Sequence, residues 1–148
     1  MADAATATPI RGSCLCGGVA FELAAPPLWM SHCHCSRCRK SGGVTTVVVR
    51  AEHFRWLRGV ELVERFAAGP AWSIVRCFCR VCGTYLGEPE THPEAFAIAA
   101  NALDDDPRVR AAFHEHVADL VPWEEIGDAL PRFAASPGGV DFAADPVR

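Results

Sequence analysis

Residues 77–83 read CFCRVCG and place three of the chain's eight cysteines within six positions. Two further clusters come before this one: residues 33–38 read CHCSRC, and residues 14–16 read CLC. Zinc in proteins takes four ligands in a tetrahedron, and thiols two or three positions apart on a turn can point at one ion. The three clusters therefore predict that the chain binds metal.

Disulfides are the competing explanation for an even number of cysteines, but they need an oxidising compartment. The N-terminal residues 1–13 (MADAATATPIRGS) show neither the basic flank nor the apolar segment of a secretion signal. No apolar run reaches the roughly 18 to 20 residues that cross a bilayer. We therefore expect a cytoplasmic protein, without a membrane segment, whose cysteines bind metal.

The spacing favours two zinc ions per chain, one structural and one catalytic. Gly83 permits a tight turn after Cys82, which favours one four-ligand site formed by Cys14, Cys16, Cys79 and Cys82. Cys33, Cys35 and Cys38 lie within six residues and can hold a second ion with its fourth position open, the arrangement that supports catalysis.

Three nearby side chains leave alternatives open. Cys77 is either a small buried thiol on a strand or a further ligand, and as a ligand it would close the second site. His32 and His34 flank the three-cysteine cluster. They are candidates for proton shuttles or for a fourth ligand, or else one faces outward while the other packs against the cluster.

Charge points to a small anionic ligand rather than to nucleic acid. Arg37, Arg39 and Lys40 form a dense basic patch beside the middle cluster and are predicted to bind the carboxylates of a substrate, with a solvated basic turn as the alternative. The net charge of −4 makes a nucleic-acid partner unlikely.

Short strands are expected along most of the chain. We predict a single domain over residues 11–134, between tails at 1–10 and 135–148. Alternating or β-branched runs predict strands at 19–23, 45–50 and 72–79. The alternation of Phe96 and Ile98, together with the short length, favours a strand at 95–103 too, although the alanines of this segment would also fit a helix. Less regular patterns predict a hairpin at 54–67, a helix-compatible stretch at 107–121 that extended backbone would also fit, and a terminal segment anchored by Trp123, Ile126, Leu130 and Phe133.

Three motifs resemble those of the glutathione-dependent formaldehyde-activating enzyme family, whose GFA domain also occurs in centromere protein V. They are GSCLCGGVAFE at 12–22, CHCSRCRKSGG at 33–43 and RCFCRVCGTYL at 76–86, and NALDDDP (101–107) and residues 116–133 resemble later signatures of the family. The resemblance implies a mainly β, Mss4-like (β-tent) zinc-binding fold. It also implies a structural zinc on Cys14, Cys16, Cys79 and Cys82 and a catalytic zinc on Cys33, Cys35 and Cys38.

Two functions from different classes follow. The resemblance implies a zinc-dependent carbon–sulfur lyase that acts on adducts of a thiol such as glutathione with a small aldehyde. The alternative is a non-catalytic, zinc-structured interaction module, since the same fold also serves as a protein-binding scaffold and fold alone does not decide function.

Overall fold

Two β-sheets enclose the core in the computed structural model, which describes residues 8–67 and 74–137. The smaller sheet has the antiparallel order β1-β2-β5, formed by Ile10–Ser13, Ala20–Leu23 and Phe54–Arg58. The larger sheet has the order β10-β3-β4-β9-β8-β7-β6. Its strands are, in chain order, Trp29–Cys33 (β3), Thr45–Arg50 (β4), Val63–Ala67 (β6), Val75–Cys79 (β7), Tyr85–Gly87 (β8), Ala95–Ala99 (β9) and Ala111–Glu115 (β10).

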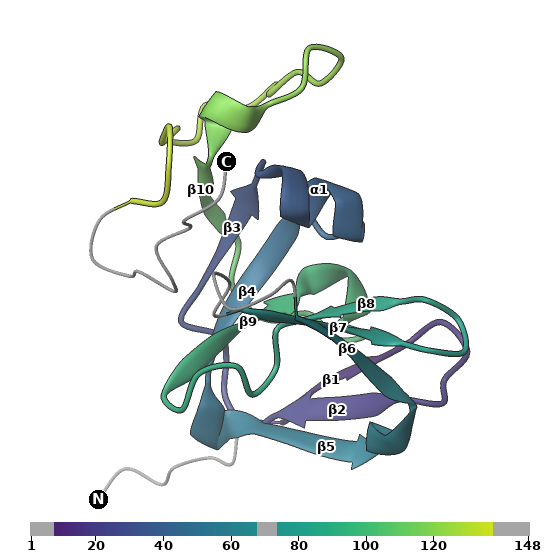
Figure 1. The fold of residues 1–148 in the computed structure, drawn as a ribbon. Helices are drawn as coiled ribbons and strands as arrows, with labels where there is room; N and C mark the ends of the chain where they lie inside the picture. Colours follow the sequence, from purple (N-terminus) through teal and green to yellow (C-terminus); the bar gives the residue numbers. More distant parts are fainter. Residues whose placement is uncertain (1–7, 68–73, 138–148) are drawn as a thin grey trace, which may run out of the picture.

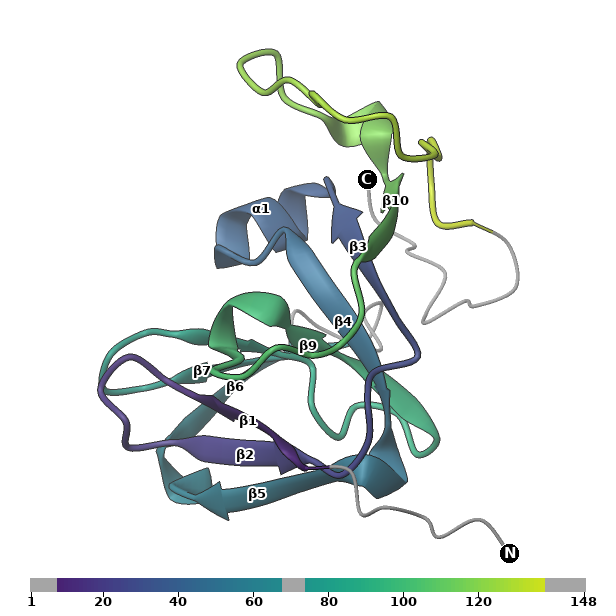
Figure 2. The same cartoon turned by 180° about the vertical axis from the view of Figure 1, so that it is seen from behind.

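The helical segments are short. One α-helix, α1, covers Ser36–Ser41 and directly follows β3 at one end of the molecule, as Figures 1 and 2 show. Three 3-10 turns lie between strands, at Ala51–His53 (η1), Val60–Leu62 (η2) and Ala100–Ala102 (η3), and a fourth, Val117–Asp119 (η4), follows the last strand. Within the described ranges, no helix is both long and apolar enough to span a membrane. The architecture is mainly β in a single unit, which confirms the predicted fold class.

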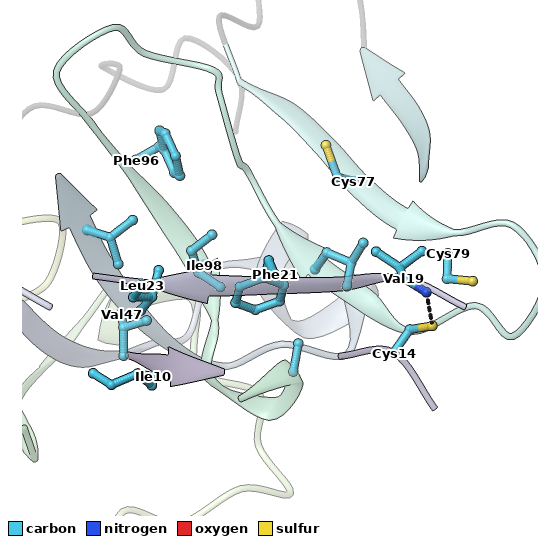
Figure 3. Close-up of a cluster of buried hydrophobic side chains, with 13 residues drawn as sticks. Ile10, Cys14, Val19, Phe21, Leu23, Val47, Cys77, Cys79, Phe96 and Ile98 are labelled. Atoms are coloured by element: carbon cyan, nitrogen blue, oxygen red, sulfur yellow. Dashed lines mark hydrogen bonds between the residues drawn. The ribbon is translucent and has the colours of Figure 1, made fainter. Parts of the chain in front are cut away.

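The core lies between the two sheets and is filled from both. Phe21 and Leu23 of β2 are 1% and 0% exposed and face Val47 and Ile98 of the larger sheet (Figure 3). Val47 pairs with Ile98 across β4 and β9. The β-branched run of β4 fits this central position, because residues 46–49 are all buried and such side chains pack well in a sheet covered on both faces.

The predicted hairpin at 54–67 is wrong. Its two halves form β5 and β6, but β5 pairs with β2 in the smaller sheet while β6 pairs with β7 in the larger one. Gly59 in the left-handed region and η2 turn the chain from one sheet to the other. Alternating hydrophobicity indicates that a segment is a strand, but it does not identify the strand's partner.

The helix-compatible stretch at 107–121 forms no α-helix. It contains β10, which runs parallel to β3, and the short turn η4. Arg108 and His116, at φ values of 62° and 56°, bound this strand. Extended backbone, the alternative that the pattern also fitted, is what the structure contains.

The terminal segment 123–133 is held differently from the prediction. Trp123, expected to be an anchor, is 75% exposed, and Phe133 is 38% exposed. Backbone hydrogen bonds tie the segment to β10 instead: His114 N–H donates to Pro131 O, and Phe133 N–H donates to His114 O. Phe133 adds an edge contact with Phe113, their ring centroids 5.7 Å apart.

The other predicted strands have mixed outcomes. Residues 19–23 and 45–50 contain β2 and β4. Within 95–103, β9 ends at Ala99 and the short turn η3 follows it. Residues 72 and 73 of the predicted strand 72–79 lie outside the described residues, and β7 covers the remainder from Val75. β1, β3 and β8 were not predicted, and Ile10 at the start of β1 is only 1% exposed.

Candidate metal centres and the adjoining cavity

Two turns from distant parts of the chain bring four cysteines together. The β1–β2 and β7–β8 turns lie side by side at one end of the sheets (Figures 1 and 2). The sulfurs of Cys14, Cys16, Cys79 and Cys82 all lie within 4.8 Å of one another. The Cys14–Cys16 and Cys16–Cys79 sulfur distances are 3.5 Å and 3.8 Å. Four sulfurs at this separation fit a tetrahedral zinc ion.

Backbone and hydroxyl donors surround this group of four sulfurs. Val19 N–H donates to Cys14 Sγ over 3.2 Å, as the dashed line in Figure 3 shows. The hydroxyl and N–H of Thr84 hold the pKa of Cys82 at about 5, well below the ordinary thiol value. The same hydroxyl accepts a hydrogen bond from Leu15 N–H at 2.9 Å, which ties the first turn to the second. These donors stabilise thiolates, the form that binds metal.

The second group comes from one short stretch of chain. Cys33 ends β3, Cys35 caps the N-terminus of α1, and Cys38 lies inside the helix. The three sulfurs lie within 4.8 Å of one another and the residues are 7%, 4% and 5% exposed. Cys38 N–H donates to Cys35 Sγ over 3.3 Å. This capping bond directs the Cys35 sulfur toward Cys38.

Proton sharing within this group favours one thiolate on Cys35. The Cys33 and Cys38 thiols donate to its sulfur and hold its pKa far below the ordinary value, whereas these contacts and burial raise the pKa of Cys33 far above it. Binding of a divalent metal would therefore release the protons of the remaining thiols. Three sulfur donors with no fourth protein ligand among the described residues fit a zinc ion with one open position.

Cys77 lies outside both groups. It is fully buried, and its sulfur accepts a hydrogen bond from Arg65 Nη1 at 3.4 Å. Burial raises its pKa to about 11, which keeps it a thiol. In Figure 3 its side chain points away from Cys79, two residues along the same strand. The position matches the reading of Cys77 as a small buried thiol.

The two histidines beside the cluster bind other partners. His32 Nδ1 lies 2.9 Å from Thr45 Oγ1, and His34 Nε2 lies 2.8 Å from His114 Nδ1. Neither ring belongs to the group of three sulfurs. Burial, followed by the nearby His114, lowers the pKa of both His32 and His34, so the neutral rings are favoured at neutral pH.

His34 is the end of a hydrogen-bonded chain that the sequence did not reveal. His114 Nε2 lies 3.0 Å from Asp128 Oδ2. A carboxylate only accepts, so His114 donates from Nε2, and in the tautomer with no proton on Nδ1 it receives the Nε2 proton of neutral His34. His34 Nδ1 then carries a lone pair, which is buried and has no hydrogen-bond partner among the described residues. Glu124 Oε2 lies 4.0 Å from it.

A cavity of about 340 Å³ opens beside the three-cysteine group. It combines cationic groups with aromatic walls, and its lining residues are Arg37, Lys40 and Ser41 of α1, Phe66, Arg76, Phe78, Gly83 and Tyr85. Arg76 connects the cavity to the cluster, because its Nη1 lies 3.8 Å from Cys38 Sγ. Of the three basic residues singled out in the sequence, Arg39 does not line the cavity.

Arg76 was not identified as a site residue from the sequence. The available signal was a charged side chain at position 76, on the same face of the predicted strand as Ile74 and Phe78. A cation within an alternating apolar pattern indicates a buried partner, and the structure provides one in Glu88, 2.9 Å from Arg76 Nη1. His114 and Asp128 gave no comparable signal, because only the parallel pairing of β10 with β3 brings His114 beside His34.

Comparisons with known proteins agree with this arrangement. A model of the family described as "Glutathione-dependent formaldehyde-activating enzyme" matches residues 9–119. A crystal structure of a Rhodobacter sphaeroides protein is similar, with 29% sequence identity and a TM-score of 0.55, over 66% of this chain and 92% of that chain. A comparison with curated proteins gave no match. The solved neighbour and the two cysteine groups are consistent with the expected Mss4-like fold.

Proposed function

Because the chain belongs to the family of glutathione-dependent formaldehyde-activating enzymes, we propose that it is a zinc-dependent carbon–sulfur lyase. The reaction would join a thiol and a small aldehyde, or cleave their adduct. The observation that carries the proposal is the group of three buried sulfurs, without a fourth protein ligand among the described residues, next to a cationic cavity.

Different residues would bind the metal ions and the substrate. Cys33, Cys35 and Cys38 would hold the catalytic zinc, and Cys14, Cys16, Cys79 and Cys82 would hold a structural one. A zinc ion in the open site would lower the pKa of an incoming thiol, so that it reacts as thiolate. The cationic groups of Arg37 and Lys40 in the cavity wall would bind carboxylates of a thiol such as glutathione.

The balanced reaction needs no redox partner. The thiol loses its proton, its sulfur forms a bond to the carbonyl carbon, and the carbonyl oxygen gains a proton to give a hydroxyl. Cleavage is the reverse, in which the carbon–sulfur bond breaks and the hydroxyl proton leaves. The buried position of the three cysteines limits access of water to the reacting sulfur.

We place the reaction in the cytoplasm. All eight cysteines are free thiols, and seven of them belong to groups that need reduced sulfur to hold metal. A reducing compartment keeps them in that state and supplies small thiols at the same time.

Thiol binding is the direct test. Calorimetry of zinc-loaded protein with glutathione, run in buffers of different ionisation enthalpy, should report binding with release of a proton. The double variant Arg37→Ala/Lys40→Ala should bind glutathione at least tenfold more weakly while binding a neutral thiol almost as well as the wild type. Arg39→Ala, on the same helix but outside the cavity lining, is the matched control and should match the wild type.

Turnover is tested separately by NMR exchange between formaldehyde, glutathione and their adduct, the pair named in the family description. Zinc-loaded wild type should accelerate the exchange, and Cys38→Ser should not. Absence of zinc-dependent binding of any thiol would contradict the proposal and favour the interaction module.

A further inference from the structure

Arg76 is a buried cation at the junction of the cavity and the three-cysteine group. Its residue is 8% exposed, and its Nη1 contacts Cys38 Sγ at 3.8 Å, Glu88 Oε1 at 2.9 Å and the Tyr85 hydroxyl. Its guanidinium carbon also lies 5.7 Å from the centroid of the Tyr85 ring. Tyr85 of β8 and Glu88, which follows that strand, therefore fix one guanidinium against one cysteine sulfur.

Stability alone does not account for this arginine. Glu88 is also only 8% exposed, so both charges of the pair have lost most of their hydration. Replacement of such a buried ion pair by apolar side chains is often neutral or stabilising. The buried pair of Arg76 with Glu88 is thus better explained by the effect of Arg76 on the Cys38 sulfur than by its contribution to stability.

The charge of the three-cysteine site, once it holds a metal, explains what the Arg76 guanidinium would do there. Three thiolates and one divalent cation carry a net negative charge, and this charge would lie in a buried environment. A guanidinium beside one sulfur offsets that charge, and its hydrogen bond fixes the direction in which the sulfur's remaining lone pairs point. Groups that hydrogen-bond to metal ligands typically change metal affinity by about 10- to 100-fold when they are removed.

We infer that Arg76 is a positioning residue for the second metal site: its guanidinium places a positive charge, and a hydrogen bond that Nη1 shares with Glu88 and Tyr85, beside the Cys38 thiolate, which orients that sulfur and strengthens metal binding. The inference rests on the zinc site of the proposed function, but it does not depend on the identity of the thiol or on turnover.

The chain contains a matched control. Arg65 on β6 donates from Nη1 to Cys77 Sγ at 3.4 Å and pairs with Glu90 at 3.0 Å, so it makes the same kinds of contact as Arg76, at a more exposed position. Cys77 belongs to neither metal group. Arg65→Met therefore removes an arginine–cysteine contact without touching a metal ligand.

The test uses cobalt(II) as a spectroscopic substitute for zinc in the full chain. In Arg76→Met, the affinity of the three-cysteine site should fall about 10- to 100-fold. Its sulfur-to-cobalt charge-transfer band should move to longer wavelength, because a sulfur that accepts no hydrogen bond gives up its electrons more easily. Arg65→Met should leave affinity and band unchanged, and the cobalt spectrum of the four-cysteine site reports in each variant that the fold is intact.

Arg76→Met leaves Glu88 buried without its partner, so Arg76→Met/Glu88→Gln provides a second variant without a buried unpaired charge. The same affinity loss and band shift are expected in this variant. Unchanged affinity and band in the folded variants would overturn the role of Arg76 alone, as would an equal change in Arg65→Met. A wild-type protein that binds only one cobalt ion would overturn the second metal site as well.

Discussion

The four-cysteine and three-cysteine groups use similar motifs but depend on the fold in opposite ways. The first joins the β1–β2 turn to the β7–β8 turn, so its sulfurs meet only when both sheets are formed. The second lies within residues 33–38, on the end of β3 and the first turns of α1. A metal in the first group would hold distant segments together, whereas a metal in the second would add to a segment that is already folded.

Exposure also separates the two groups. Cys16 is exposed and Cys82 is half-buried, whereas all three cysteines of the second group are buried. The group that links the sheets thus lies near the surface, and the group beside the cavity is enclosed. Their positions and ligand numbers favour a structural role for the four-cysteine group and a chemical role for the three-cysteine group. Four experiments test this comparison.

The largest difference is expected between Cys79→Ser and Cys38→Ser. Loss of a ligand from the four-cysteine group should leave the protein unfolded or insoluble, because structural zinc contributes about 10 to 16 kcal/mol of apparent binding free energy in small zinc domains. Cys38→Ser should stay folded and lose about one zinc ion per chain. Circular dichroism and metal analysis measure both, and equal damage in the two variants would remove the distinction.

Two glycines, one beside each group, sharpen the comparison. In Gly59→Ala the new methyl would lie 2.0 Å from Gly18 O, in the turn that carries Cys16, and Gly59 also has a φ of 72°. Backbone strain and overlap together should cost about 3 kcal/mol or more.

Gly42 caps α1 with a φ of 81°, and a Cβ there would meet no atom within 4 Å. Gly42→Ala should therefore cost only the left-handed penalty of about 1 to 2 kcal/mol. Urea unfolding at constant m-value gives both differences. A larger effect at Gly42 would mean that the helix beside the three-cysteine group, rather than the linking turns, limits stability.

A chelator should remove the two metals in sequence. We expect the three-cysteine site to lose zinc at a chelator concentration at least tenfold lower than the four-cysteine site, because it has one protein ligand fewer. The far-ultraviolet circular dichroism should stay constant during the first loss and collapse during the second. Simultaneous release would show that burial of the second site compensates for its missing ligand.

The smallest effect concerns Asp128. Its carboxylate contacts His114 of β10, the strand that pairs with β3 beside the three-cysteine group. The Leu130 N–H and then His114 lower the pKa of its carboxyl below the ordinary value of 3.8. A lowered folded pKa contributes stability above the ordinary value, and this contribution is lost as the pH falls through the folded value.

The stability difference between wild type and Asp128→Asn should thus stay constant from neutral pH down to about pH 5 and shrink only in stronger acid. Hydrogen exchange of residues 128–133 should be faster in the variant at neutral pH. A difference that changes between pH 6 and 8 would show that another group controls this contact.

The parts of the sites that follow from cysteine spacing and from the four-ligand requirement of zinc could be predicted from sequence, and the other non-local contacts could not. The spacing of the cysteines indicated both groups because ligands two or three positions apart on a turn meet wherever that turn is placed. The pairing of Cys14 with Cys79 crosses most of the fold, yet the four-ligand requirement of zinc made it deducible. Arg76 and His114 obey no such requirement, and the sheet alone determines which cysteine or histidine they meet.

The same reasoning explains the error at residues 54–67. Alternation describes one strand at a time, so it gave β5 and β6 as extended but said nothing about the sheet to which each belongs. Trp123 was misplaced for a related reason. A large apolar side chain is usually buried, but the segment that carries it is tied to β10 by backbone hydrogen bonds and leaves the ring exposed.

The separation of the two turns that form the four-cysteine group also has a consequence for synthesis on the ribosome. Cys14 and Cys16 emerge first, but the group stays incomplete until Cys82 has left the exit tunnel. The cysteines at 33, 35 and 38 emerge as a complete set long before that. The nascent chain thus offers its three-thiol set to metal before its four-thiol set exists, so the ion that the finished fold needs least can be the first one it acquires.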